Sequence, residues 1–235
     1  MKTYAVIVAA GKGSRFGAGM PKQFCNLGGR PLLMTTVERM ASAVGVDNVV
    51  LVVDATMADF WLELCLEHGF ESPTLVYGGA TRLESVHNAL EAIASECDDE
   101  AVVMIHDGAR PLASVEFLRN MTVIPQQVDG VIPVVPVTDS LRQLAGDESS
   151  VAVERSRYVA VQTPQTFYLN PLLEAYRDVA ENGYLAEGLT DDASVMEAAG
   201  VKNIALSQGE PTNIKVTNPL DLAIAETLLH NQKSL

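Results

Sequence analysis

Short apolar runs alternate with helical patterns along most of the chain. Continuous apolar runs rich in β-branched residues predict buried strands at 4–10, 48–53, 101–106 and 130–135, and a weaker run predicts another strand at 73–77. Apolar positions with helical spacing predict helices between these strands at 31–44, 56–69, 81–95 and 114–127. This alternation predicts an α/β fold with a doubly wound, mainly parallel sheet and right-handed crossovers. In such sheets ligands bind at the carboxyl ends of the strands.

The alternation breaks at 136–160. Two short extended runs flank the polar turn GDESS (146–150), which predicts a projecting β-hairpin arm. An isolated hairpin is only marginally stable in water, so a second subunit is a candidate cover for the arm. Because no repeat or linker divides the sequence, we expect a single domain over 1–235, with 136–160 as its dimerisation arm. After the arm, the pattern predicts helices near 170–182 and 192–199, a strand near 201–206 and a last helix with Asn218 as N-cap.

Charge narrows the range of partners. The 235 residues include 30 acidic and 16 basic side chains, and the formal net charge of -14 argues against nucleic acid and anionic membranes. The segment from 1 to 37 nevertheless contains no acid, which predicts an anion-binding site there. The apolar run at 4–10 is too short to span a membrane. The three cysteines are far apart and form no CxxC pair, which favours reduced thiols in the cytoplasm.

A glycine-rich loop at 9–24 follows the first predicted strand. Its glycines let the backbone approach a ligand and Lys12, Arg15 and Lys22 supply positive charge, so the loop predicts a polyphosphate site. A dinucleotide-binding fingerprint requires its third glycine one place earlier, although Asp54 after the second strand keeps that alternative open. The P-loop pattern is absent, and a flexible solvated turn does not explain three cations without an anion.

The loop resembles the nucleotidyltransferase signature G-x-G-x-R-x-G-x(3)-P-K, which it matches from Gly11 to Lys22. HDGARP departs from the related pattern HDAARP at Gly108, which we expect to loosen the backbone. Together the motifs from 9 to 226 resemble the 2-C-methyl-D-erythritol 4-phosphate cytidylyltransferase family of the non-mevalonate isoprenoid pathway. The later matching segments are GG-x-x-R-x-x-SV (78–86), HDGARP (106–111), R-x(7)-TPQ-x-F (155–167), TDDAS (190–194) and NIKVT (213–217).

This resemblance implies a Rossmann-like nucleotidyltransferase fold and transfer of a cytidylyl group from CTP to 2-C-methyl-D-erythritol 4-phosphate, giving 4-diphosphocytidyl-2-C-methyl-D-erythritol and pyrophosphate. The implied CTP-binding residues are Ala9, Ala10, Gly11, Gly13, Gly78, Gly79, Arg82 and Ser85. The implied catalytic residues are Arg15, Lys22, Arg155 and Lys215. The implied acceptor-binding residues are Asp107, Arg110, Thr138, Arg155 and Lys215.

The same resemblance implies a homodimer in which Arg155 reaches into the partner's site, with Arg157 as the competing candidate. Mg²⁺ is the expected cofactor, and Asp107 is a candidate ligand or an acceptor of hydrogen bonds from hydroxyl groups. Lys215 lies in an apolar strand pattern, where burial requires an anionic partner such as a phosphate.

Three other functions fit parts of the pattern. A ribitol or ribulose 5-phosphate cytidylyltransferase shares the fold and differs in its acceptor. A metal-dependent glycosyltransferase needs a DxD motif at a strand end, where 106–109 supplies a single acid. The non-enzymatic alternative is a nucleotide-sensing or NAD-binding module, which does not explain the set of cations.

Overall fold

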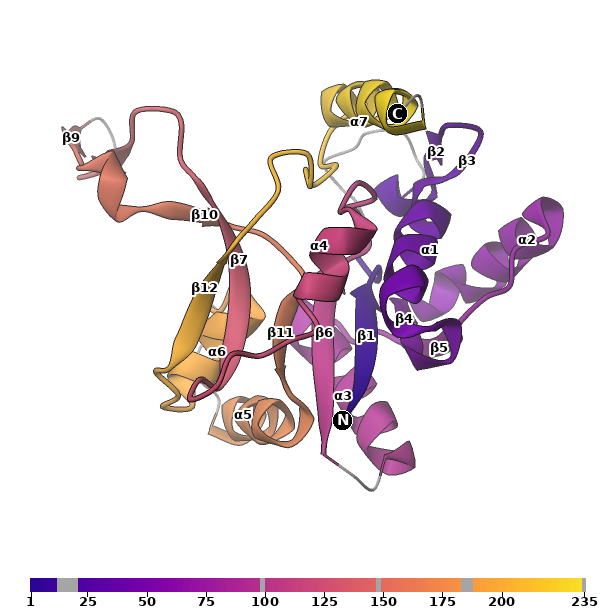
Figure 1. The fold of residues 1–235 in the computed structure, drawn as a ribbon, viewed down its shortest axis with the longest axis horizontal. Coiled ribbons are helices and arrows are strands. Elements are labelled where there is room, and N and C mark those ends of the chain that lie inside the picture. Colours follow the sequence, from indigo (N-terminus) through magenta and orange to yellow (C-terminus); the bar gives the residue numbers. More distant parts are fainter. Residues whose placement is uncertain (12–20, 98–99, 147–148, 183–187, 234–235) are drawn as a thin grey trace.

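The computed structural model describes residues 1–235 apart from 12–20, 98–99, 147–148, 183–187 and 234–235. Its centre is one sheet with the order β10-β7-β11-β6-β1-β4-β5, and β12 also pairs with β7 (Figure 1). β1, β4, β5 and β6 run parallel, as do β7 and β12, which confirms the predicted mainly parallel α/β sheet. The strands are β1 (Lys2–Val8), β4 (Val49–Val53), β5 (Thr74–Tyr77), β6 (Ala101–Asp107), β7 (Gly130–Pro136), β10 (Val159–Val161), β11 (Gln165–Tyr168) and β12 (Ile204–Gln208).

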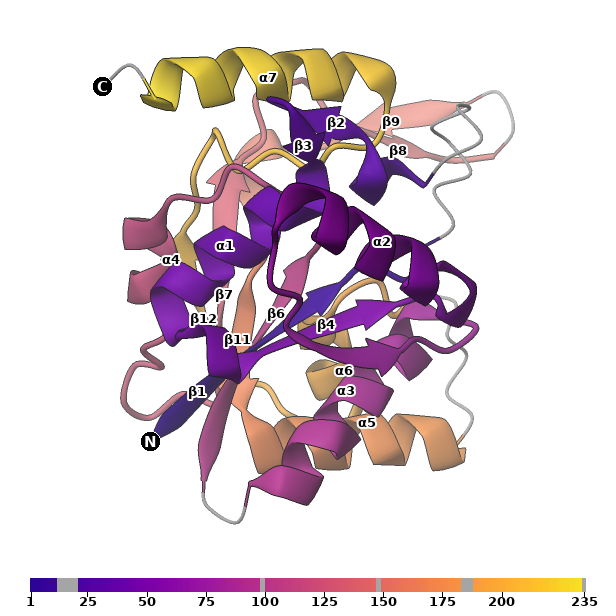
Figure 2. The same ribbon diagram turned by 90° about the vertical axis from the view of Figure 1, so that its right-hand side faces the viewer.

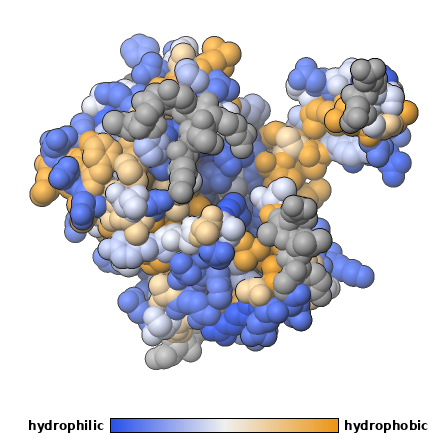
Figure 3. Space-filling model, turned by 180° about the vertical axis from the view of Figure 1, so that it is seen from behind, coloured by the Kyte–Doolittle hydropathy of each residue, from blue (hydrophilic) through white to orange (hydrophobic). Residues whose placement is uncertain are grey.

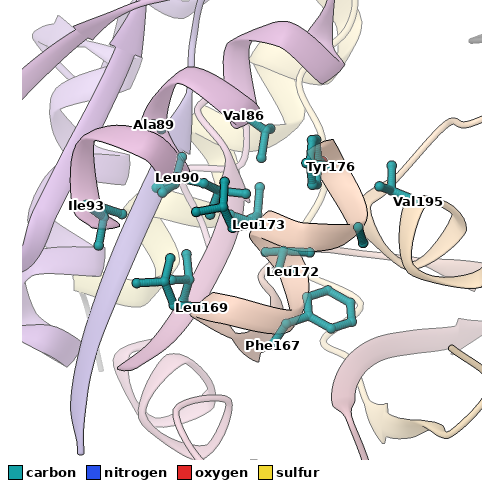
Figure 4. Close-up of a cluster of buried hydrophobic side chains, with 14 of the residues drawn as sticks. Val86, Ala89, Leu90, Ile93, Phe167, Leu169, Leu172, Leu173, Tyr176 and Val195 are labelled. Carbon is teal, nitrogen blue, oxygen red and sulfur yellow. The ribbon is translucent and has the colours of Figure 1, made fainter. Parts of the chain in front are cut away.

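Helices cover both faces of this sheet (Figures 1 and 2). Consecutive strand residues serve opposite cores: Tyr4 and Val6 pack on the side of α3, α5 and α6, and Ala5 and Ile7 on the side of α1, α2 and α4. Figure 4 shows the first core, where leucines of α3 and α5 meet. The sheet is therefore doubly wound. The helices are α1 (Leu32–Val44), α2 (Ala58–His68), α3 (Arg82–Glu96), α4 (Val115–Asn120), α5 (Leu169–Asn182) and α6 (Asp192–Ala198).

Two elements differ from the sequence-based expectation. β11 lies antiparallel between β6 and β7, and the apolar pattern missed it because Gln165 and Thr166 are polar although both are 0% exposed. α4 ends at Asn120 rather than near 127, because β-branched residues and then Pro125 follow. In β11, tertiary packing overrides the polar composition of the strand. In α4, the local composition ends the helix early.

The segment 162–164 interrupts the strand formed by β10 and β11. Val161 pairs with Val134 of β7, whereas Thr166 pairs with Val131, so the register shifts between the two segments. The peptide bond between Thr163 and Pro164 within this interruption is cis. The residues of the interruption therefore leave the regular ladder, and their side chains contact other parts of the chain.

The predicted arm is a hairpin that projects from the body (Figure 1). It consists of β8 (Arg142–Leu144) paired antiparallel with β9 (Ser150–Ala152), and η4 (Arg155–Arg157) follows it. Leu144 is 81% exposed, and Figure 3 shows apolar surface on the arm and on the strands that join it to the body.

The last helix, α7 (Pro219–Lys233), begins as predicted, because Asn218 Oδ1 accepts a hydrogen bond from Asp221 N at 3.0 Å. It packs over the short strands β2 (Asn26–Leu27) and β3 (Arg30–Pro31). Among the described residues, no helix has both the length and the apolar character needed to cross a membrane.

Candidate active site

A cleft of about 650 Å³ opens at the carboxyl ends of β1 and β6. This is the edge of the sheet where a parallel α/β fold places its ligands. The predicted site residues that line it are Ala9, Ala10, Gly11, Lys22, Gly79, Arg82, Ser85, Asp107 and Lys215. Gly13 and Arg15 lie outside the described residues. The cleft therefore brings together residues from motifs that are far apart in the sequence.

Gln23 supports the start of the glycine-rich loop. Its Nε2 donates to the backbone oxygens of Ala9 at 2.7 Å and Gly11 at 3.1 Å, and the side chain is buried. The next residue, Phe24, packs edge-on against Phe60 with ring centroids 5.4 Å apart, which anchors η1 (Lys22–Phe24). Sequence reasoning assigned Gln23 no role, although Gln23 and Phe24 open the run QFCNLGGRPLL (23–33), which resembles the QF-x-x-L-x-G-x-PLL run of cytidylyltransferases.

The Gly78-Gly79 pair follows β5, and its second glycine, Gly79, lines one wall of the cleft. A Cβ on Gly78 would lie 2.4 Å from the Cβ of Ala10, so only glycine fits against the end of β1. Ser85 Oγ accepts from Gly79 N at 3.1 Å and donates to Thr81 O at 2.8 Å. Thr81 in turn caps α3, because its side chain accepts from Glu84 N. Hydrogen bonds within the protein thus hold this wall.

Arg82 reaches the cleft from the first turn of α3. Its Nη1 and Nη2 donate to the two carboxylate oxygens of Asp192 at 2.9 and 2.7 Å. Tyr176 Oη donates to the same carboxylate at 2.6 Å, and Asp192 is 0% exposed. Burial and then the charge of Asp192 raise the pKa of Tyr176 well above its usual value. Asp192, from TDDAS, therefore orients Arg82, a role that sequence reasoning did not assign.

Asp107 stands at the end of β6 among cations. Its Oδ2 lies 3.0 Å from Lys215 Nζ and 3.1 Å from Arg110 Nε. Burial alone would raise the pKa of Asp107, but the charges of Lys215, Arg110 and Arg82 outweigh it and hold this pKa well below its usual range. Asp107 therefore stays ionised and is an anionic partner of Lys215. The expected apolar strand around Lys215 is wrong, because 213–217 forms no strand and the Lys215 side chain is 42% exposed.

Arg110 is directed to the protein rather than to the cleft. Its Nη1 donates to the backbone oxygen of Asn213 at 2.8 Å, while its Nε contacts Asp107. Arg110 and Gly78 are two predicted site residues that do not line the cleft. In this structure Arg110 joins the turn after β6 to the segment that leads to Lys215.

His106 is buried beneath this turn. Its Nδ1 lies 3.1 Å from Thr163 Oγ1 and its Nε2 3.2 Å from Arg110 O. Thr163 Oγ1 also accepts from Asp107 N at 3.0 Å, so its hydrogen is available for Nδ1 and His106 carries its proton on Nε2. Burial lowers the pKa of His106 to about 4, which keeps the ring neutral. The histidine therefore packs and hydrogen-bonds within the protein, and Thr163 is a contact that sequence reasoning missed.

Thr138 and Arg155 lie together in the arm. Arg155 Nη1 donates to Thr138 O, and both side chains are exposed. Neither residue lines the cleft of its own chain. The structure therefore separates these two predicted acceptor-binding residues from the cleft that holds Asp107 and Lys215.

A Rossmann-like sheet with a glycine-rich loop after β1 and cations around the cleft at its strand ends defines a nucleotidyltransferase. The family model described as 2-C-methyl-D-erythritol 4-phosphate cytidylyltransferase matches residues 3–231. The chain therefore belongs to the 2-C-methyl-D-erythritol 4-phosphate cytidylyltransferase family, and it is a cytidylyltransferase.

Individual relatives carry the same name. The chain is 45% identical to a protein of Porphyromonas gingivalis over 97% of its own length and 98% of the relative's. It is 41% identical to one of Bacteroides thetaiotaomicron, over 97% and 100% of the two chains. The crystal structure of the Thermus thermophilus enzyme superimposes with a TM-score of 0.73 at 32% identity, over 96% and 98% of the two chains. All three are named 2-C-methyl-D-erythritol 4-phosphate cytidylyltransferase.

Proposed function

We propose that the cleft joins CTP to 2-C-methyl-D-erythritol 4-phosphate by holding both phosphate groups among its cations. The observation that carries this is the convergence of Lys22, Arg82 and Lys215 on one cleft, from three distant motifs. An oxygen of the acceptor phosphate attacks the α-phosphorus of CTP, the bond to the β-phosphate oxygen breaks, and pyrophosphate leaves. The enzyme acts in isoprenoid precursor biosynthesis, as its family does.

The nucleotide occupies the side of the cleft formed by the end of β1, the segment 9–11 and Gly79. Positive charge from Lys22 and Arg82, with the backbone of the loop, suits a triphosphate. Lys22 and Arg15 stabilise the charge that develops on the α-phosphoryl oxygens. Positioning and electrostatic stabilisation then account for catalysis without a covalent intermediate.

The acceptor phosphate binds beside Lys215. A phosphate monoester is already ionised near pH 7, so its attack needs no general base. This agrees with a neutral, buried His106, whose two ring nitrogens are both engaged within the protein. Asp107 and the fixed Arg110 hold Lys215 in place until the phosphate arrives.

Mg²⁺ is the proposed cofactor, and Asp107 is the residue of the cleft that would hold it. A carboxylate oxygen beside a phosphate-binding surface suits this ion, which takes one or two carboxylates together with substrate phosphates. Within the described ranges, no three His, Cys, Asp or Glu side chains gather into a metal site, so the substrate supplies the remaining ligands. When bound, the ion neutralises phosphate charge.

The arm suits a homodimer in which Arg155 and Thr138 complete the site of the partner subunit. Leu144 and Val151 on the arm are 81% and 52% exposed, and an isolated two-stranded hairpin is only marginally stable in water. Burial of these side chains on a second copy would stabilise both the arm and the position of Arg155. We also propose a cytoplasmic location, which the odd number and wide spacing of the three cysteines favour.

The decisive assay measures pyrophosphate release from CTP and Mg²⁺ with each of three acceptors. We expect turnover with 2-C-methyl-D-erythritol 4-phosphate, and at least about 10³-fold lower kcat/KM with ribitol or ribulose 5-phosphate, which lack the matching hydroxyl pattern. A higher kcat/KM with either pentose derivative would contradict the proposed acceptor.

A mixing experiment tests the arm. Arg155→Ala and Lys215→Met homodimers should each be nearly inactive, whereas subunit exchange in a 1:1 mixture should restore about a quarter of wild-type activity. Half of the exchanged dimers are mixed, and each mixed dimer has one intact site if Arg155 serves the partner. No recovery after verified subunit exchange would show that Arg155 does not act across a dimer.

A further inference from the structure

The strand interruption at 162–164 contacts the segment that leads to Lys215. Gln162 is only 6% exposed, and its Nε2 donates to the backbone oxygen of Glu210 at 2.9 Å. Its Oε1 accepts from Glu210 N at 3.1 Å. The Gln162 side-chain amide therefore binds both the backbone N–H and the backbone oxygen of Glu210. A Cβ on Gly209 would lie 2.6 Å from this Oε1, so the backbone approaches Gln162 as closely as only glycine allows.

Asn213 continues the same contact two residues before Lys215. It is 0% exposed, its Nδ2 donates to Thr163 O at 2.8 Å, and its own backbone oxygen accepts from Arg110 Nη1 at 2.8 Å. On the other side of Lys215, the backbone N of Val216 donates to Ala109 O at 2.8 Å. The backbone around Lys215 is therefore fixed to the strand interruption and to the turn after β6.

The hydrogen bonds of Gln162 and Asn213 serve to fix the position of the Lys215 backbone more than to stabilise the folded protein. Buried amides rigidify a protein when they are satisfied, and they cost free energy when they are not. Asn213 Oδ1 is buried without a hydrogen-bond partner in the part of the chain that the structure describes. The side chain of Lys215 is 42% exposed and long, so its reach depends on where its backbone is held.

We propose that Gln162 and Asn213 are positioning residues that fix the backbone of Lys215 so that its ammonium group meets the acceptor phosphate. This inference rests on the proposed role of Lys215 in acceptor binding. Neither Gln162 nor Asn213 lines the cleft, so they act on the substrate only through Lys215. Removing these side chains should therefore weaken the use of the acceptor and leave the binding of CTP unchanged.

Steady-state kinetics on Gln162→Met tests this, because methionine keeps the volume and removes the hydrogen bonds. We expect kcat/KM for the acceptor to fall by about 10- to 100-fold, with the KM for CTP within about twofold of wild type. Thr166→Val is the matched control, since Thr166 is fully buried nearby and its Oγ1 has no hydrogen-bond partner among the described residues. This control should keep wild-type kinetics.

A double-mutant cycle separates positioning from general damage. In a Lys215→Met background, adding Gln162→Met should lower kcat/KM by less than about twofold, because the group that it positions is gone. The positioning role would be overturned if Gln162→Met lowered kcat/KM as much in the Lys215→Met background as in wild type. Wild-type acceptor kinetics in Gln162→Met would also overturn it. Wild-type acceptor kinetics in Lys215→Met would instead overturn the proposed role of Lys215, and the positioning role with it.

Gly209→Ala provides a second variant if Gln162→Met does not fold. Its added Cβ would lie 2.6 Å from Gln162 Oε1 and 3.1 Å from Val134 O, so the methyl group displaces the Gln162 amide although no hydrogen-bonding group is removed. We expect the same selective fall in kcat/KM for the acceptor. An equal fall in kcat/KM for CTP and for the acceptor would count against positioning.

Discussion

Two bidentate arginine–carboxylate pairs tie α3 to its neighbours, and they should differ greatly in what they contribute to stability. Arg82 pairs with Asp192 at 2.9 and 2.7 Å, and Arg177 pairs with Glu91 at 2.7 Å through both contacts. Their geometry is similar. Their burial is not, because Asp192 is 0% exposed whereas the side chains of Arg177 and Glu91 are 50% and 41% exposed.

Arg82→Met leaves the Asp192 carboxylate buried with Tyr176 as its remaining hydrogen-bond donor in the triad. Removing one partner of a buried pair costs about 3–5 kcal/mol, because the other charge stays desolvated. Arg177→Met removes an exposed pair, which costs about 0.2–1 kcal/mol. Tyr176→Phe removes one hydrogen bond to a charged group and keeps the ring, so its cost should be intermediate, about 1.5–3 kcal/mol.

Urea unfolding of the three variants and wild type measures these differences directly. For a chain of this size each 1 kcal/mol lowers the melting temperature by about 2–4 °C, so thermal scans give an independent ranking. Equal destabilisation by Arg82→Met and Arg177→Met would refute the claim that the buried carboxylate makes the difference. A Tyr176→Phe variant as stable as wild type would refute the role of the tyrosine hydroxyl.

Further predictions concern catalysis and pH. Lys22→Ala should lower kcat by about 10²-fold and change the KM for CTP less, since the loss of one oxyanion donor acts mainly on the transition state; an unchanged kcat would refute its catalytic role. Unfolded histidine binds a proton near pH 6.5, whereas burial lowers the pKa of folded His106 to about 4. The unfolded state therefore binds more protons between these values, and the free energy of unfolding should fall by about 3 kcal/mol as the pH drops from 6.5 to 4. Urea unfolding of His106→Gln should lack this contribution, and parallel pH curves for variant and wild type would contradict it.

The sequence predicts the fold well where burial and composition agree. Continuous apolar strands such as β1, and the capped start of α7 at Asn218, follow from the pattern alone. β11 does not, because Gln165 is buried to bind α6: its Nε2 donates to Asp191 Oδ2 and its Oε1 accepts from Ala193 N. A polar residue whose partners lie in a distant segment carries no periodic signal.

The site shows the same limit. Motifs indicated that Lys22, Arg82 and Lys215 belong to one site, and the structure places all three around one cleft. The residues that orient them were not predictable from spacing, because Asp192 and Gln162 act through tertiary contacts with Arg82 and the segment before Lys215. Asp192 and Asn213 do stand in matched motifs, TDDAS and NIKVT, but the partner that each side chain contacts is visible only in three dimensions.

Gly108 shows how a single departure from a motif changes meaning once its neighbours are known. The missing methyl group was expected to loosen the backbone, yet Gly108 N donates to Val8 O at 2.9 Å and Gly108 O accepts from Thr36 Oγ1 at 3.0 Å. A Cβ would lie 3.0 Å from the Cβ of Ala9, so the glycine lets the turn after β6 approach the end of β1. The next residue, Ala109, accepts from Val216 N at 2.8 Å, so the turn after β6 is hydrogen-bonded to the end of β1 on one side and to the segment around Lys215 on the other. Hydrogen bonds on both sides of the turn therefore limit the freedom that the glycine would otherwise give its backbone.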